Sequence, residues 1–340
     1  MKEIILDFLN FLKNVLVIIL VICVLLITVE YCLPIFEAGF NNDSSARYYT
    51  DSGNWMGNVD GSLKLNQISI PGSHDSAARH AWLGFFSDCQ SLSISQQLDA
   101  GYRYLDIRLA VSKDRLKFMH GFTNCRTSFA PWSKTLYLED ELEGIYSFLK
   151  KNPTETIIFN VKQEHGKESV SEFENILNSY VQKNPQYWYL SSSIPTLDEA
   201  RGKIVLARRY EDEAGLKEAS GLPLIWIDQR GSQPSEEAAE LFESESLLLV
   251  IQDRFEYTLQ DKWKAFFGLY TSNPVKGVDD AILINFLSTK GSLTYGHPFY
   301  YASTLNKKFA KLSKDADTNA GWVILDYCTA KIARMIYTNN

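Results

Sequence analysis

The sequence predicts an α/β protein built as a (β/α)8 barrel of the TIM type and preceded by an N-terminal transmembrane helix. The first observation is a series of short apolar or β-branched runs that predict eight strands, near Ile68, Tyr104, Leu116, Thr156, Ile204, Leu247, Ile282 and Val323. The second is a set of helical patterns between several of these strands, at residues 136–151, 170–184, 260–270 and 306–314. The third is an uncharged apolar segment near the N-terminus. Strands and helices that alternate in this number favour a barrel, in which functional residues gather at the C-terminal ends of the strands.

The N-terminal segment is apolar enough to enter a membrane. The run Val15–Val29 carries no charge and is almost entirely aliphatic. Because no small-x-small cleavage pattern follows it, we expect residues 1–36 to be an uncleaved anchor, and secretion after signal cleavage is the alternative. Lys2 and Lys13 precede the run, and no basic residue follows before Arg47. This asymmetry predicts a single-pass protein with a cytosolic N-terminus and an extracellular or lumenal catalytic part.

Composition narrows the rest of the chain. Residues 37–60 are rich in Asn, Ser, Asp and Gly and are predicted as a linker, which leaves residues 61–340 as the barrel domain. The net charge of -7 argues against a nucleic-acid partner and against membrane attachment by general electrostatics. The five cysteines lack C-x-x-C spacing, so we expect no zinc site. Cys89 and Cys125 fall in polar loops and could form a disulfide in an oxidising compartment.

Two histidines are the strongest candidates for chemistry. His74 follows the first predicted strand, and His120 closes the strand that begins at Leu116. An imidazole near its ordinary pKa of about 6.5 can take or give a proton, so two such rings can act as base and acid across one bond. Asp326 closes the run Gly321–Asp326. We therefore expect the ends of the first, third and eighth predicted strands to converge on one mouth.

Further charged residues mark the ends of other strands. Asp106 and Arg108 are spaced i, i+2, so on a strand both side chains point to the same face. Lys162 and Arg209 end otherwise apolar strands. Because an unpaired buried charge is costly, these side chains reach solvent or line a polar cleft.

Taken together, the motifs resemble the phosphatidylinositol-specific phospholipases C, and in particular their bacterial-type, metal-independent branch. The resemblance covers roughly residues 60–335 and rests on nine motifs in order, namely Ile70-Pro-Gly-Ser-His-Asp75, Gln97-Leu-Asp-Ala-Gly-Tyr-Arg-Tyr-Leu-Asp-Ile-Arg108, His120-Gly121, Phe148-Leu-Lys-Lys-Asn-Pro-Thr-Glu-Thr156, Ala200-Arg-Gly-Lys-Ile-Val205, Val250-Ile-Gln-Asp253, Ile284-Asn-Phe286, Tyr300-Tyr-Ala-Ser303 and Gly321-Trp-Val-Ile-Leu-Asp-Tyr327. It implies a distorted barrel that cleaves phosphatidylinositol to diacylglycerol and inositol 1,2-cyclic phosphate without any cofactor.

The resemblance also implies catalytic roles. His74 would take the proton of the inositol 2-hydroxyl, which attacks the phosphorus, while Asp326 supports the imidazolium that forms. His120 would protonate the departing diacylglycerol oxygen, with Asp75 assisting. Arg108 would bind the non-bridging phosphate oxygens, where charge must be stabilised. No protein nucleophile is required.

A second group of residues is implied for substrate binding. The inositol-binding positions correspond to Lys162, Arg209, Asp253 and Phe255. The family usually has tyrosine where Phe255 stands. Asp106 belongs with this group and is expected to hold Arg108 or His120 in place, with a purely structural salt bridge as the alternative. Animal members of the superfamily hold calcium near this strand, whereas Arg108 puts a guanidinium there, so we expect no metal requirement.

The implied partners are the membrane bilayer and a phosphatidylinositol or glycosylphosphatidylinositol lipid. In the family the loop corresponding to His80–Phe86 dips into the interface, and ordinary lid packing is the alternative. Other functions remain open: cleavage of glycosylphosphatidylinositol anchors, which share the phosphodiester, a non-catalytic lipid-binding barrel, and a metal-dependent phosphodiesterase of related fold.

Overall fold

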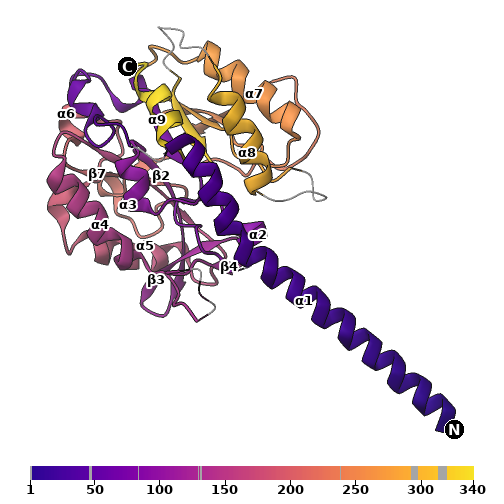
Figure 1. The fold of residues 1–340 in the computed structure, drawn as a ribbon. Coiled ribbons are helices and arrows are strands. Elements are labelled where there is room, and N and C mark those ends of the chain that lie inside the picture. The colour runs from indigo at the N-terminus through magenta and orange to yellow at the C-terminus, as the bar shows by residue number, and fades with distance from the viewer. Residues whose placement is uncertain are drawn as a thin grey trace.

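A curled sheet forms the centre of the domain in the computed structural model, which describes residues 2–45, 48–82, 84–128, 130, 132–237, 239–291, 298–312 and 320–340 (Figure 1). The strands are β1 (Ile70–Ser73), β2 (Tyr104–Ser112), β3 (Arg115–His120), β4 (Thr123–Asn124), β5 (Ile157–Gln163), β6 (Trp188–Tyr189), β7 (Ile204–Arg208), β8 (Leu222–Pro223), β9 (Glu240–Ser244), β10 (Leu247–Gln252), β11 (Ala281–Phe286) and β12 (Trp322–Leu325). Neighbours follow the order β6-β7-β5-β2-β1-β12-β11-β10-β9, and β8 pairs with β7.

This arrangement confirms the predicted α/β barrel-type fold, in an open form. All pairs from β6 to β10 along this order are parallel, and only the edge strand β9 is antiparallel to its neighbour. Among the described residues the path has two ends, so β9 and β10 do not pair with the strands around β7. The buried parallel strands read as continuous apolar runs, which is why the sequence signals them clearly.

The prediction that the run near Leu116 forms the third strand of the parallel barrel was wrong. Strand β3 pairs antiparallel with β2, with Leu109 opposite Phe118. Only Lys113 and Asp114 separate the two strands, and Lys113 has a φ of 63°. A parallel crossover needs about a dozen residues or more, whereas two residues suffice for a hairpin. Strand β2 therefore extends past the barrel, and β3 carries the chain back toward it.

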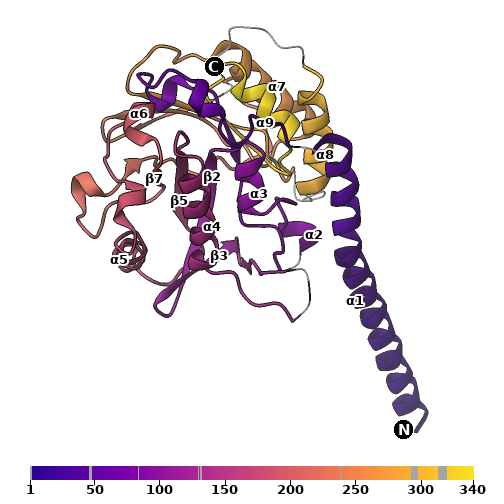
Figure 2. The same ribbon diagram turned by 60° about the vertical axis from the view of Figure 1, so that its left-hand side comes forward.

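Most helices of the domain cover the outer side of the sheet (Figures 1 and 2). The helices are α2 (Gly84–Ser87), α3 (Ile94–Asp99), α4 (Leu138–Lys151), α5 (Val170–Val181), α6 (Leu197–Ala200), α7 (Leu259–Ser272), α8 (Pro298–Phe309) and α9 (Ala330–Tyr337), of which α2 packs against α8 instead of against the sheet. Three of the four helices expected from the sequence correspond to α4, α5 and α7. The fourth, expected at residues 306–314, was misplaced, because α8 ends at Phe309, residues 310–312 form a turn, and residues 313 and 314 lie outside the described residues. Helix α4 shows the local logic, because three acidic residues occupy its first turn and two lysines its last, which complements the helix dipole.

At β2 and β5 the sheet separates two apolar clusters. Tyr104 belongs to the larger cluster, which also includes residues of α7, α8 and α9, while its neighbour Leu105 packs with the cluster under α4 and α5. Ile158 and Phe159 of β5 divide in the same way. Successive side chains of a strand point to opposite faces, so one strand serves both regions.

The segment predicted as a linker is partly built into the fold. Residues 37–45 continue the N-terminal helix, and Trp55 and Met56 are buried. The indole of Trp55 stacks on Tyr337 at 5.1 Å and donates to the carbonyl of Gly101 at 2.9 Å. The segment is polar in overall composition but contains two large apolar side chains. Their burial holds the segment against α9.

The predicted N-terminal apolar helix is present as α1 (Lys2–Ser45) and projects away from the barrel (Figure 2). Its 44 residues span about 66 Å at 1.5 Å per residue, about twice the thickness of a bilayer core. The portion Glu3–Thr28 has the length and hydropathy of a membrane span, and none of it is buried against the protein. Near the barrel, α1 contacts α2 and α9.

Candidate active site

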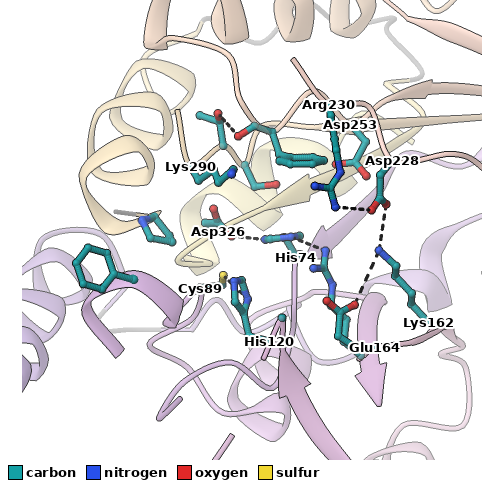
Figure 3. Close-up of a pocket in the computed structure, with 17 residues that line it drawn as sticks. His74, Cys89, His120, Lys162, Glu164, Asp228, Arg230, Asp253, Lys290 and Asp326 are labelled. Carbon is teal, nitrogen blue, oxygen red and sulfur yellow. Dashed lines mark hydrogen bonds and ion pairs between the residues drawn. The ribbon is translucent and has the colours of Figure 1, made fainter. Parts of the chain in front are cut away.

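A pocket of about 220 Å³ opens at the C-terminal ends of the strands (Figure 3). The predicted site residues that line it are His74, Arg108, His120, Lys162, Asp253, Phe255 and Asp326. Several of these residues immediately follow a strand. His74 follows β1, Asp253 follows β10 and Asp326 follows β12. Of the remaining predicted residues, Asp75, Asp106 and Arg209 are not in its lining but contact those that are.

His74 is held in one orientation by two side chains. Its Nδ1 lies 2.7 Å from Oδ1 of Asp326, and its Nε2 lies 2.7 Å from Nη2 of Arg108. A guanidinium can only donate, so Nε2 accepts and the ring proton resides on Nδ1, where it is donated to Asp326. Burial lowers the pKa of His74, but the charges of Asp326 and Asp106 outweigh it and raise the pKa above its ordinary value.

His120 forms a second pair with a carboxylate. Its Nδ1 lies 2.6 Å from Oδ2 of Asp75, which is almost completely buried. Asp75 adopts a left-handed φ of 41°, and its N–H donates to Oδ2 of Asp106 at 3.1 Å. The hairpin return of β3 brings His120 to the mouth, so its ring centroid lies 6.5 Å from that of His74. The two imidazoles therefore face one pocket from different elements.

Arg108 and Asp106 lie on the same face of β2, as their spacing predicts. Nε and Nη2 of Arg108 donate to Oδ2 of Asp106 at 3.2 and 3.1 Å. Burial alone would raise the pKa of Asp106, but Arg108, His74 and Arg209 lower it to about 2. Asp106 is thus a fixed negative charge beneath the guanidinium. Arg108 also has its Nε 3.7 Å from Oδ2 of Asp75, so one cation links both histidine–carboxylate pairs.

The other end of the pocket holds alternating charges that include Asp228, which sequence reasoning missed. Oδ1 of Asp228 lies 3.0 Å from Nζ of Lys162 and 3.4 Å from Nη2 of Arg209. Arg209 also lies 3.7 Å from Asp253, and its guanidinium stacks 3.6 Å over Trp226. Asp228 directly follows the apolar run 222–227. That pattern matches the one that identified Lys162 and could have revealed it.

The remaining predicted residue, Phe255, lies at the rim. It lines the pocket, and Nζ of Lys290 lies 5.6 Å from its ring centroid. Glu164 also lines the pocket, 3.9 Å from Nζ of Lys162. Sequence reasoning did not single out Lys290 or Glu164, because neither ends an apolar strand.

Cys89 is a further lining residue with an unexpected position. The disulfide that the sequence left open between Cys89 and Cys125 is not formed in the structure, where both cysteines are buried free thiols. The sulfur of Cys89 lies 3.6 Å from Nδ1 of His120, between that ring and the side chain of Asp326 (Figure 3). The Cys89 thiol therefore faces the imidazole of His120 in the pocket and does not bond to another cysteine.

Exposed aromatic side chains lie in and just before α2 and just beyond His120. We call Trp82, Phe86 and Phe122 the aromatic rim. Their exposed fractions are 56%, 53% and 75%. Phe86 lines the pocket, and Phe122 lies two residues beyond His120. Of the loop predicted to contact the interface, Leu83 lies outside the described residues.

Comparisons with known proteins agree with this geometry. Residues 64–210 match the family described as phosphatidylinositol-specific phospholipase C, X domain. The 1-phosphatidylinositol phosphodiesterase of Staphylococcus aureus is 30% identical over 293 residues, which cover 81% of this chain and 88% of that protein. Its namesake from Listeria monocytogenes is 27% identical over 300 residues, covering 84% of each. A solved structure of a mutant phosphatidylinositol-specific phospholipase C from Staphylococcus aureus aligns with a TM-score of 0.70 and 28% identity, over 85% of this chain and 97% of that one. As its sequence motifs indicate, the chain belongs to the phosphatidylinositol-specific phospholipase C family.

Proposed function

We propose that this protein is a membrane-anchored phospholipase C that cleaves phosphatidylinositol to diacylglycerol and inositol 1,2-cyclic phosphate. The observation that carries the proposal is the pair of imidazoles 6.5 Å apart across one pocket, each bonded to a buried carboxylate, with the Arg108 guanidinium between them. The relatives from Staphylococcus aureus and Listeria monocytogenes are named for phosphodiesterase action on the same lipid.

The first half of the reaction needs a neutral base, and the state of His74 supports that role. Its Nε2 lone pair would accept the proton of the inositol 2-hydroxyl, whose oxygen then bonds to phosphorus. Asp326 stabilises the imidazolium that results. In the structure this lone pair accepts from Arg108 at 2.7 Å. A phosphate group competes for the guanidinium, so substrate binding frees the base.

The second half needs an acid on the opposite side of the phosphorus. His120, as an imidazolium supported by Asp75, would give its proton to the diacylglycerol oxygen as the bond from that oxygen to phosphorus breaks. Arg108 would hold the non-bridging oxygens throughout. The attacking oxygen belongs to the substrate, so the chain needs no nucleophile of its own.

The inositol end of the pocket favours an uncharged ring. Lys162 and Arg209 are both within 4 Å of carboxylates, from Asp228 and Asp253. Glu164 and Arg230 also line this end, paired with Lys162 and Asp228. Three cations and three anions leave it close to neutral, which suits ring hydroxyls better than a further phosphate. Phe255 would pack against the ring face. We propose these residues as the headgroup-binding set, supported by Asp106 beneath Arg108.

The apolar helix supports a membrane location. We propose that α1 anchors the chain with its N-terminus in the cytosol, so that residues 61–340 act outside the cell or in a lumen. The aromatic rim, which adjoins the mouth, suits insertion into the lipid interface next to the headgroup. Mass analysis of the mature protein tests the anchor, because removal of the first 36 residues would instead indicate a secreted enzyme.

Phosphorus NMR of the products tests the proposed reaction. Full-length protein in detergent, given phosphatidylinositol and a chelator, is expected to produce an inositol cyclic phosphate signal. His74→Ala and His120→Ala are expected to abolish it, whereas His165→Ala, an exposed histidine, serves as the matched control. Binding of lipid without any product would favour a non-catalytic barrel. Activity that requires added calcium would contradict the metal-free mechanism.

Cleavage of glycosylphosphatidylinositol anchors uses the same phosphodiester and requires a separate comparison. Cells exposed to the active protein would lose anchored surface proteins if this substrate is used. Turnover of free phosphatidylinositol with no loss of anchored protein would restrict the activity to the free lipid.

A further inference from the structure

Cys89 lies where both histidine–carboxylate pairs can reach it. Among the described residues two groups could hold a metal ion, His74 with Cys89 and Asp326, and His120 with Cys89 and Asp75. In each group the three ligand atoms lie within 4.8 Å of one another. Cys89 is common to both, and the proposed reaction does not use its thiol.

The charges around Cys89 attract a cation. Asp326 lines this part of the pocket, and the carboxylates of Asp75 and Asp106 are buried behind it. Arg108 pairs with Asp75 and Asp106, while Asp326 pairs with His74. Three negative charges against one positive charge leave the neighbourhood negative before the imidazoles are counted. A divalent ion that enters through the pocket is therefore favoured electrostatically.

We propose that Cys89, His120 and Asp75 form a binding site for Zn²⁺ and that occupation of this site inhibits the enzyme. Thiolate, imidazole and carboxylate are the ligands that Zn²⁺ takes in proteins, and a catalytic pocket leaves its fourth position to water. The thiolate also favours Zn²⁺ over Ca²⁺ or Mg²⁺, which prefer oxygen ligands. Binding of the metal is independent of the proposed function, whereas the inhibition rests on it.

The distances fit with one local adjustment. Tetrahedral Zn²⁺ separates a sulfur from a nitrogen ligand by about 3.5 Å and a nitrogen from an oxygen by about 3.3 Å. The sulfur of Cys89 already lies 3.6 Å from Nδ1 of His120. Oδ2 of Asp75 lies 2.6 Å from the same nitrogen, because a hydrogen bond joins them. The metal replaces the hydrogen of that bond, so the carboxylate must move outward by somewhat less than 1 Å.

Binding of Zn²⁺ removes protons from Cys89 and His120, and the loss from His120 prevents its proposed role as the acid. The Cys89 thiol and the Nδ1–H of His120 each release a proton to solvent, so that the sulfur binds as thiolate and Nδ1 binds through its lone pair. An acid in the proposed reaction must carry hydrogens on both ring nitrogens. A ring whose Nδ1 holds Zn²⁺ cannot do so, and it has lost its bond to Asp75. Protonation of the leaving oxygen is therefore blocked.

Cobalt tests the site without any activity assay. Co²⁺ takes the same ligands as Zn²⁺, and full-length protein titrated with Co²⁺ is expected to show a thiolate-to-cobalt charge-transfer band in the near ultraviolet. Zn²⁺ should displace the Co²⁺ and remove the band. Cys89→Ser should abolish it, whereas Cys125→Ala, which removes an equally buried thiol outside both groups, should keep it. A band that persists in Cys89→Ser, or no band in the wild type, overturns the proposal.

The wild-type protein gives a second test that does not depend on any variant folding correctly. X-ray absorption of the Zn²⁺-loaded chain should reveal one sulfur near 2.3 Å and nitrogen or oxygen ligands near 2.0 Å, as expected for these ligands. A shell without sulfur contradicts the site.

Inhibition is measured last, with each variant compared to its own activity without metal. Zn²⁺ should inhibit the wild type, Ca²⁺ and Mg²⁺ should not, and Cys89→Ser should need about 100-fold more Zn²⁺ because it lacks the soft ligand. Equal sensitivity of the wild type and Cys89→Ser refutes the inhibitory role. If the protein cleaves no phosphatidylinositol at all, the proposed function fails, while the cobalt and absorption results still decide the metal site.

Discussion

Replacement of Asp326 by asparagine tests how the proposed base is supported. Oδ1 of Asp326 accepts from Nδ1 of His74 at 2.7 Å, and the carboxylate is 3% exposed. Asparagine keeps the shape and an acceptor oxygen but not the charge. A hydrogen bond to a charged group contributes about 1.5–3 kcal/mol, and every 1.4 kcal/mol is about tenfold in rate. Since in the proposed reaction the imidazolium forms as the 2-hydroxyl loses its proton, we expect kcat/KM to fall by about 10- to 150-fold.

The same substitution changes the pH dependence in a defined direction. Burial lowers the pKa of His74, and the charges of Asp326 and Asp106 raise it above its ordinary value. A base works when it is neutral, so the wild-type rate should rise with pH through a value above about 6.5. Without the charge of Asp326 the pKa falls, and the rise should move to lower pH.

The assay is kcat/KM for diacylglycerol release, measured across pH with phosphatidylinositol in detergent micelles. Asp279→Asn, at an exposed aspartate, is the matched control and should behave as the wild type. The reasoning is refuted if Asp326→Asn retains activity within threefold of the wild type, or if the rise in rate moves to higher pH.

Three further predictions concern stability, the interface and metal. Glu155 and Arg103 form a fully buried ion pair at 2.8 Å, so Glu155→Gln should lower the free energy of unfolding by about 3–5 kcal/mol, and thermal unfolding in detergent that matches the wild type would contradict this. Trp82→Ser with Phe122→Ser, neither of which lines the pocket, should reduce activity on bilayer phosphatidylinositol at least about tenfold, because large apolar side chains are lost from the interface. Hydrolysis of soluble inositol cyclic phosphate should be unchanged, and an equal loss on both substrates would argue against an interfacial role. Chelation of divalent metal ions should leave the rate of the purified enzyme undiminished, and a loss restored by calcium would exclude the metal-free mechanism.

The parts of the fold that can be predicted well from the sequence are those set by local pattern. Parallel strands buried on both faces appear as apolar runs. Strands β7 and β10 have this character up to their last residue, β11 has it apart from the buried Asn285, and β5 has it up to Val161 apart from the buried Asn160. The i, i+2 spacing of Asp106 and Arg108 is by itself enough to place both side chains on one face of a strand. The position of β3 was also within reach, because a two-residue connection permits only a hairpin. A count of strands alone assigns β3 to the parallel barrel. The connection from β2 to β3 is too short for β3 to be a parallel barrel strand.

The parts of the site that escaped prediction depend on contacts between distant segments. Asp228 forms ion pairs with Lys162 of β5 and with Arg209, which directly follows β7. No local sequence pattern indicates which residues will pair in this way. Cys89 lies in a polar loop, where the local residues indicate a thiol but not the direction in which it points. Its neighbour His120 is 31 positions away. The chemistry that each residue type permits can therefore be read from the chain, while the pairing of those residues follows from the tertiary fold.

The two proposed catalytic histidines are held by different parts of the fold, one by the central parallel sheet and the other by a hairpin. His74 is attached to β1, whose neighbours β2 and β12 hold it within the central parallel sheet. His120 arrives on the hairpin strand β3, outside the main path of the sheet. Lengthening the loop beyond His120 therefore changes the mouth without straining the barrel or the base. Variation among relatives in the segment between β4 and α4 should alter which lipids reach the pocket, while the His74–Asp326 pair stays constant because the barrel itself fixes it.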